Sequence, residues 1–185
     1  MLRKTIKYFI LIVMLTIAGL VTMSGCSHNQ ETLTWTEVIS DIRDKYPNVK
    51  QFRTDKLYSW LTGSRNGSII LIDARGKEEF RVSHITGARN IPYDKDPLKH
   101  LTNIKPDSPI VVYCSVGYRS SILAGKLQDM GFTEVYNLEG SIFKWANEGR
   151  PLVQGKVTVH KVHPYNAHWG NLLERKYHVK TSNVE

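Results

Sequence analysis

Short apolar stretches alternate with amphipathic ones through the middle of the chain. Residues 68–73 and 109–113 are short runs of β-branched and other apolar side chains, which is typical of buried strands, and 134–138 is expected to be another strand. Residues 120–130 instead carry apolar side chains at helical spacing, and Gly131 follows where a helix would end. Strands that alternate with helices predict an α/β fold with a parallel sheet covered on both faces.

Further elements are expected before and after this pattern. Residues 34–46 have the apolar spacing of a helix, and Pro47 ends it. A second helix contains Leu57 and Leu61, and Thr54 is its expected N-cap. Shorter strands or helical turns are expected at 49–52, 77–82, 88–91 and 142–145.

The first 25 residues have the pattern of an export signal. A basic start precedes an apolar run at 8–21, which is shorter than the membrane span of about 20 residues. The segment Met-Ser-Gly-Cys ends at Cys26 and resembles the lipobox of bacterial lipoproteins, in which the cysteine is lipidated and becomes the new N-terminus. We therefore expect an exported lipoprotein, anchored in the membrane through Cys26 on the periplasmic or another extracytoplasmic face. Ordinary secretion with a free Cys26 is the alternative.

The chain after this signal peptide divides into three parts. Residues 26–48 form a tether and an N-terminal helix, 49–153 the main domain, and 154–185 a C-terminal extension. The net charge of +8 falls to +5 without the signal peptide, which leaves 22 basic and 17 acidic residues. Since no basic run is interleaved with aromatic residues, nucleic acid is not an expected partner. A mildly basic surface suits small anions and anionic lipids.

Cysteine usage directs attention to Cys114. The chain has two cysteines, and lipidation of Cys26 through its sulfur would remove the only disulfide partner. A lone thiol in an exported protein indicates reactivity or intermolecular pairing, although buried free cysteines are also common as small hydrophobic residues. Cys114 directly follows the expected strand 109–113, at the edge where open α/β sheets bind ligands.

The residues after Cys114 favour a nucleophile over a packing residue. Gly117 permits a positive φ, so that successive backbone N–H groups can converge in an anion-binding turn. The following helix N-terminus adds positive potential, and Arg119 adds a fixed charge. These features favour the thiolate, which is the reactive form of cysteine, and a bound oxyanion beside it.

Three segments together resemble rhodanese-like sulfurtransferases. CSVGYRS at 114–120 is similar to the active-site loop of that family, and LIDARGKEEFRVSHITGARNIP at 71–92 to its upstream signature. VYNLEGSIFKW at 135–145 is similar to the closing segment, with Ser141 in place of a second glycine. The resemblance covers about 49–153. It implies a rhodanese-like fold, with a central, mostly parallel five-stranded sheet and helices on both faces.

The resemblance also implies a thiosulfate sulfurtransferase that needs no organic cofactor or metal. Cys114 would take sulfur from a small sulfur-containing anion such as thiosulfate, form a persulfide, and pass the sulfur to a thiol or to cyanide. The residues expected to bind the substrate and cradle the persulfide are Ser115, Val116, Gly117, Tyr118 and Arg119.

Supporting roles are expected for Asp73, Arg75 and Ser120. Asp73 and Arg75 follow the strand 68–73, and we expect them to form a structural ion-pair network that includes Glu79. His84 is interpreted as structural, because a thiolate held by the loop needs no general base.

Two other functions are compatible with parts of this pattern. Cysteine-dependent phosphatases and arsenate reductases have five residues between the cysteine and the arginine, whereas four separate Cys114 from Arg119. The shorter loop suits a sulfur atom better than a tetrahedral oxyanion. A non-enzymatic persulfide carrier, or a redox or partner-binding module, stays open.

The extension 154–185 contains four histidines and lies outside the resemblance. Trp169, Leu172 and Leu173 are expected to anchor a closing helix on the domain. Packing is favoured over metal binding for the histidines at 160, 163 and 168. A further hypothesis is that the extension covers the active-site mouth and filters acceptors.

Overall fold

The computed structural model describes residues 33–63 and 67–179, which belong to one compact unit of the chain. The expected signal peptide and the lipidation at Cys26 lie outside the described residues. Within 33–63 and 67–179, no helix is both long enough and apolar enough to cross a membrane.

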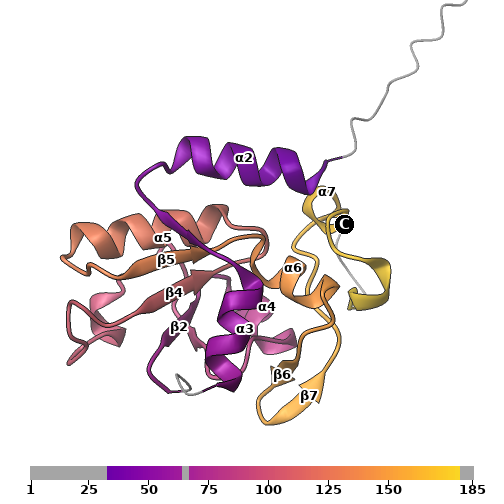
Figure 1. Ribbon diagram of the computed structural model, residues 1–185. Helices are drawn as coiled ribbons and strands as arrows, with labels where there is room; N and C mark the ends of the chain where they lie inside the picture. Colours follow the sequence, from indigo (N-terminus) through magenta and orange to yellow (C-terminus); the bar gives the residue numbers. More distant parts are fainter. Residues whose placement is uncertain (1–32, 64–66, 180–185) are drawn as a thin grey trace, which may run out of the picture. The chain divides into compact units, whose positions relative to one another are not determined.

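A five-stranded parallel sheet forms the centre of the domain (Figure 1). The strands lie in the order β1-β5-β4-β2-β3, and every neighbouring pair is parallel. The central strand is buried at every position, which explains its uninterrupted apolar sequence. The predicted fold class is therefore confirmed. The strands are β1 (Lys50–Phe52), β2 (Ile70–Asp73), β3 (Arg89–Asn90), β4 (Ile110–Tyr113) and β5 (Val135–Leu138).

Helices cover both faces of this sheet (Figure 1). On β4, Ile110 and Val112 point to one face, where they join the core that includes α5. Val111 and Tyr113 point to the other face and pack in the core that includes α3 and α6. The helices of this part are α2 (Trp35–Lys45), α3 (Thr54–Thr62), α4 (Lys77–Val82), α5 (Tyr118–Asp129), α6 (Ser141–Asn147) and the 3₁₀ turn η1 (Leu98–His100).

Two helix starts differ from the sequence-based expectation. The prediction of Thr54 as an N-cap is wrong, because Arg53 occupies that position and Thr54 is the first helical residue. The Thr54 hydroxyl donates to Glu148 at 2.9 Å instead, which ties α3 to the end of α6. Helix α5 begins at Tyr118 rather than at 120, because Gly117 turns the chain directly into it with a φ of 133°.

The C-terminal extension packs as part of the same unit. A hairpin of β6 (Leu152–Gln154) and β7 (Val157–Val159), absent from the sequence-based prediction, spans the boundary expected after residue 153. Leu172 and Leu173 are buried in the core beside α6, which confirms their expected anchoring role. Between them and the hairpin lies the short helix α7 (Ala167–Gly170), and the 3₁₀ turn η2 (Arg175–Tyr177) follows.

Candidate active site

Cys114 lies at the carboxyl end of β4, immediately before the turn into α5. Its side chain is almost completely buried, and its Sγ accepts a hydrogen bond from the backbone N–H of Gly117 at 3.1 Å. The Ser120 hydroxyl lies 3.4 Å from the same sulfur. A donor aimed at Sγ can stabilise negative charge that forms on the sulfur during a reaction.

The Gly117 amide is the donor committed to the sulfur. The Ser120 hydroxyl has a single proton, and it also lies 3.1 Å from the Gly117 carbonyl and 2.6 Å from Asn137 Oδ1. The Ser120 hydroxyl can therefore donate to Sγ only when it does not donate to the Gly117 carbonyl or to Asn137. Asn137 is a buried polar residue near the end of β5 and was not predicted to lie at the site. Its side-chain N–H₂ group donates to Gln51 at 2.8 Å.

Gly117 is needed for space as well as for its backbone angle. A Cβ at this position would lie 2.8 Å from Cδ1 of Ile42 on α2, and its φ of 133° is one that other residues rarely adopt. The absence of a side chain lets α2 approach the loop closely. This approach brings Lys45, on the same helix, to the edge of the site.

The start of α5 leaves backbone donors beside the sulfur. The first helical hydrogen bond is donated by Ser121 N–H to the Gly117 carbonyl at 3.0 Å. Within the described part of the chain, the N–H groups of Tyr118 and Arg119 consequently have no acceptor, as expected for a first helical turn, and the N–H of Val116 in the turn before it has none either. These residues and Ser115 line the cavity that contains Cys114, so their amides are available to a bound anion or persulfide.

Ser141 holds the cysteine from the opposite side. Its φ is 51°, so a serine adopts a left-handed conformation at the position where the resembled segment has a second glycine. The serine hydroxyl compensates, because it accepts from the Cys114 N–H and lies in bonding distance of the Leu138 carbonyl, both at 3.1 Å. The N–H groups of Ile142 and Phe143 bind the carbonyls of Cys114 and Ser115, which fixes the loop to α6.

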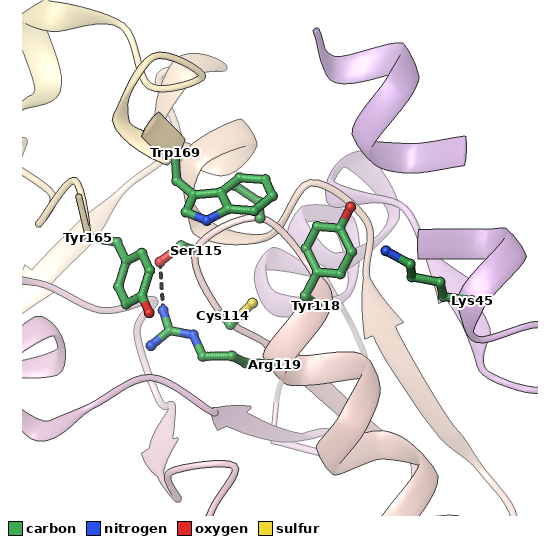
Figure 2. Close-up of a pocket in the computed structure, with 8 residues that line it drawn as sticks. Lys45, Cys114, Ser115, Tyr118, Arg119, Tyr165 and Trp169 are labelled. Atoms are coloured by element: carbon green, nitrogen blue, oxygen red, sulfur yellow. Dashed lines mark hydrogen bonds between the residues drawn. The ribbon is translucent and has the colours of Figure 1, made fainter. Parts of the chain in front are cut away.

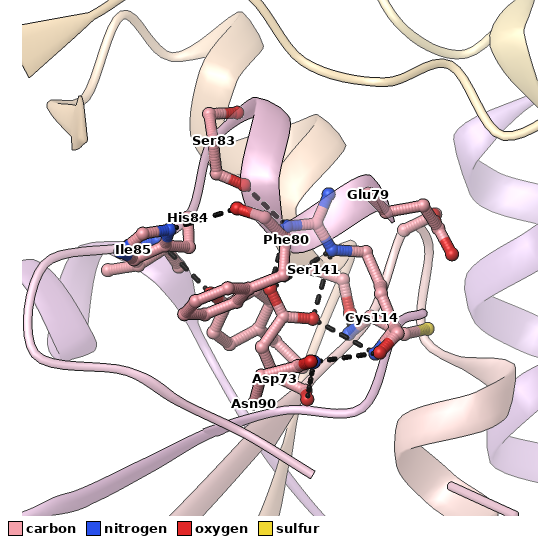
Figure 3. Close-up of polar contacts among 12 residues, drawn as sticks. Asp73, Glu79, Phe80, Ser83, His84, Ile85, Asn90, Cys114 and Ser141 are labelled. Carbon is pink, nitrogen blue, oxygen red and sulfur yellow. Dashed lines mark hydrogen bonds and ion pairs between the residues drawn. The ribbon is translucent and has the colours of Figure 1, made fainter. Parts of the chain in front are cut away.

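A buried ion pair supports the neighbouring strand end (Figure 3). Asp73 accepts from the backbone N–H of Arg75 and from its guanidinium, with the closest contact at 2.6 Å, and neither side chain is exposed to solvent. Arg75 also donates to the Ser83 carbonyl at 2.7 Å. Burial alone would lower the pKa of Arg75, but the charge and hydrogen bonds of Asp73 act with the nearby Tyr113 and Glu79 to raise it, so the guanidinium stays charged.

Glu79 pairs with Arg119 and not, as expected from the sequence, with Arg75. It does not hydrogen-bond Arg75; its two carboxylate oxygens accept from the Arg119 guanidinium at 2.7 and 2.8 Å. The Ser115 hydroxyl lies 3.2 Å from Glu79 and 2.9 Å from Arg119. Burial would raise the pKa of Glu79, but the hydrogen bonds and charge of Arg119, with smaller contributions from Arg75 and the Gly76 N–H, hold the pKa below its ordinary value. Arg119 therefore fastens the loop to α4.

His84 has the structural role that was expected. Its Nδ1 lies 3.0 Å from the Phe80 carbonyl, and its ring stacks on Phe80 with centroids 3.8 Å apart. Its backbone pairs with Val153 at the start of the C-terminal hairpin. These contacts join α4 to β6.

A cavity of about 420 Å³ opens over the sulfur (Figure 2). One wall is the cysteine loop, and Lys45 of α2 stands at its edge. The other wall is aromatic and comes from the C-terminal extension, through Tyr165 and Trp169. Trp169 was expected only as an anchor, and Lys45 and Tyr165 were not expected at the site, because no local pattern shows which distant segment returns to it.

The fold and the site define a parallel α/β domain with one thiol at the N-terminus of a helix. The family model of the rhodanese-like domain matches residues 55–148, so the chain belongs to the rhodanese-like family. The match includes the whole cysteine loop and stops before Tyr165 and Trp169.

Relatives in this family include sulfurtransferases. The chain is 33% identical to a sulfurtransferase of Allochromatium vinosum over 85 residues, which are 46% of this chain and 78% of the relative. It is 40% identical to the adenylyltransferase and sulfurtransferase UBA4 of Meyerozyma guilliermondii over 45% of this chain, but spans only 22% of that relative's length. The crystal structure of the BH2092 protein from Bacillus halodurans shares the fold, with a TM-score of 0.54 and 22% identity over 69% of this chain and 90% of that one.

Proposed function

We propose that this protein is a sulfurtransferase that carries sulfane sulfur from a donor such as thiosulfate to a thiol or to cyanide. The observation that carries the proposal is Cys114 Sγ, held at the start of α5 with the Gly117 N–H aimed at it and an open cavity above. The family, and the names of relatives such as the sulfurtransferase of A. vinosum, support sulfur as the transferred group.

The transfer needs two displacements at sulfur. The Cys114 thiolate attacks the outer sulfur of thiosulfate, the bond between the two thiosulfate sulfurs breaks, and sulfite leaves with the electron pair. The N–H groups of Val116, Tyr118 and Arg119 would hold the negative charge of the resulting persulfide. An acceptor thiolate or cyanide then attacks the outer sulfur and releases the Cys114 thiolate.

Intact-mass measurement tests this function directly. The protein should gain the mass of one sulfur atom on incubation with thiosulfate and lose it on treatment with cyanide, with thiocyanate as product. Cys114→Ser should gain nothing. If no sulfur donor produced the adduct, the proposal would be refuted. If the adduct formed but its sulfur was not transferred catalytically to any acceptor, the protein would be a persulfide carrier instead of an enzyme.

We also propose that the domain is held at the extracytoplasmic face of a membrane by lipid on Cys26. The support is the sequence of the first 26 residues, and the many CH₂ groups of the acyl chains would each add about 0.8 kcal/mol of membrane affinity. Expressed in a bacterial host, the wild-type chain should incorporate labelled fatty acid and sediment with membranes. Cys26→Ser should do neither, and fatty-acid labelling of that variant would contradict the assignment.

A further inference from the structure

The aromatic wall of the cavity is held firmly by the C-terminal extension. Val162 lies in the core, and its backbone exchanges hydrogen bonds with Tyr177 and Val179 at 2.7 and 3.1 Å. Asn147 of α6 donates to the Leu172 carbonyl at 2.8 Å and accepts from the Glu174 N–H at 2.9 Å. Residues 163–171, which carry the two aromatic side chains, are therefore fastened at both ends.

Tyr165 is set over the active-site arginine (Figure 2). Its ring centroid lies 4.5 Å from Cζ of Arg119, and its backbone has a φ of 66°, which is uncommon for a bulky residue. The Tyr165 N–H donates to Nδ1 of His163 at 3.0 Å, which helps to hold this conformation. Burial lowers the pKa of His163 and so favours the neutral ring that accepts this bond.

Trp169 closes the cavity beside Tyr118. The two rings lie 5.3 Å apart at 57°, and Asn166 caps the short helix by accepting from the Trp169 N–H at 3.0 Å. Trp169 is only partly buried, so part of its ring is left for a bound molecule. The three aromatic rings and the thiol consequently line one cavity.

Both cationic side chains of the cavity already have a carboxylate partner. Arg119 is paired with Glu79, and Lys45 lies 2.9 Å from Asp41, which also accepts from the Tyr118 hydroxyl. The positive charge that these two side chains offer to a doubly charged inorganic anion such as thiosulfate is therefore partly neutralised, and the backbone amides of the loop would carry more of its binding. The cavity volume of about 420 Å³ lies within the range of about 300–1,000 Å³ that is typical of sites for organic ligands.

We infer that this domain prefers organic sulfane-sulfur donors, in which a single anionic group is attached to a flat apolar portion, and that Trp169 and Tyr165 set this preference. The inference rests on the proposed sulfur transfer. The anionic end would meet the loop amides beside Cys114, and the flat portion would lie against Trp169 and Tyr165, with Tyr118 as the third ring of the cavity.

Cys114 can take a sulfur atom from two simple kinds of donor in this class. With an arenethiosulfonate, the Cys114 thiolate attacks the terminal sulfur, the S–S bond to the sulfonyl sulfur breaks, and the arenesulfinate leaves with the electron pair. With an organic hydropersulfide, attack on the terminal sulfur releases the organic thiolate. Either reaction leaves a persulfide on Cys114.

A matched pair of donors isolates the contribution of the ring. Benzenethiosulfonate and methanethiosulfonate both release a sulfinate, and only the first carries an aromatic group. For the wild-type protein, we expect kcat/KM to be about tenfold higher with benzenethiosulfonate than with methanethiosulfonate. Each value is first corrected for the difference between the two donors in their uncatalysed reaction with cyanide. Loss of one aromatic contact in Trp169→Ala should lower that ratio about five- to tenfold, whereas Trp169→Phe should keep most of it.

Val157→Ala is the control, because Val157 is exposed in the hairpin of the same extension and does not line the cavity. It should keep the wild-type ratio. Tyr165→Ala serves as a second test of the wall if Trp169→Ala fails to fold. The inference would be overturned if the corrected ratio were near one in the wild type. It would also be overturned if the ratio were unchanged in folded Trp169→Ala and Tyr165→Ala. Either result would leave the proposed function intact. No persulfide from any donor would instead reject the proposed function.

Discussion

Asp73→Asn is expected to lower the free energy of unfolding by about 3–5 kcal/mol. The substitution keeps the shape of the side chain but removes the charge that faces the Arg75 guanidinium, and both side chains are fully buried. Arg75 would then hold a positive charge in the core with only neutral acceptors beside it, the Ser83 carbonyl and the oxygen of the new amide. Chemical denaturation followed by circular dichroism measures the difference.

The chain provides a matched control for this prediction. Arg53 and Asp55 form an ion pair with the same separation of two residues, but both side chains are well exposed. Asp55→Asn should leave the denaturation midpoint unchanged within error, because water and salt screen such a pair. If both substitutions had the same small effect, the buried pair would not support the strand end as described.

The main elements of the fold could be predicted because they depend on local patterns. The strand at 110–113 is buried at every position, so its apolar run is uninterrupted and easily recognised. Gly117 shows the position of the cysteine turn because a positive φ is rarely compatible with another residue. The hairpin at 152–159 escaped prediction because its strands are three residues long and mostly exposed, which leaves no clear alternation.

The partners within the site depend on contacts between distant segments. Glu79 lies four residues from Arg75 in sequence and 40 from Arg119, yet it binds the distant arginine because α4 faces the cysteine loop. Tyr165 follows Arg119 by 46 residues and reaches it only because Leu172 and Leu173 fix the extension in the core. Periodicity shows which side chains are buried, but it carries no information on which segments meet across the sheet edge.

Glu79→Gln is expected to lower kcat for transfer from thiosulfate to cyanide about tenfold or more, without raising KM for thiosulfate. Glutamine would turn an N–H₂ group towards Arg119 and Ser115, so the cysteine loop would lose part of its attachment to α4. Arg119 would also lose the negative charge of Glu79 beside it. This loss favours binding of an anionic donor, so KM for thiosulfate should not rise. A higher KM with unchanged kcat would show that Glu79 does not position the loop.

The pH dependence of stability tests the same ion pair independently. The pKa of Glu79 in the folded protein lies below its ordinary value of 4.5, because Arg119 outweighs the effect of burial. The stabilisation is therefore fully present above the ordinary pKa and is lost as the pH falls through the lower folded-state pKa. The difference in unfolding free energy between the wild type and Glu79→Gln should be about 2–3 kcal/mol near neutral pH and should shrink below about pH 4. Glu78→Gln, on the exposed side of the same helix, should show no such change, since its pair with Arg81 is open to solvent.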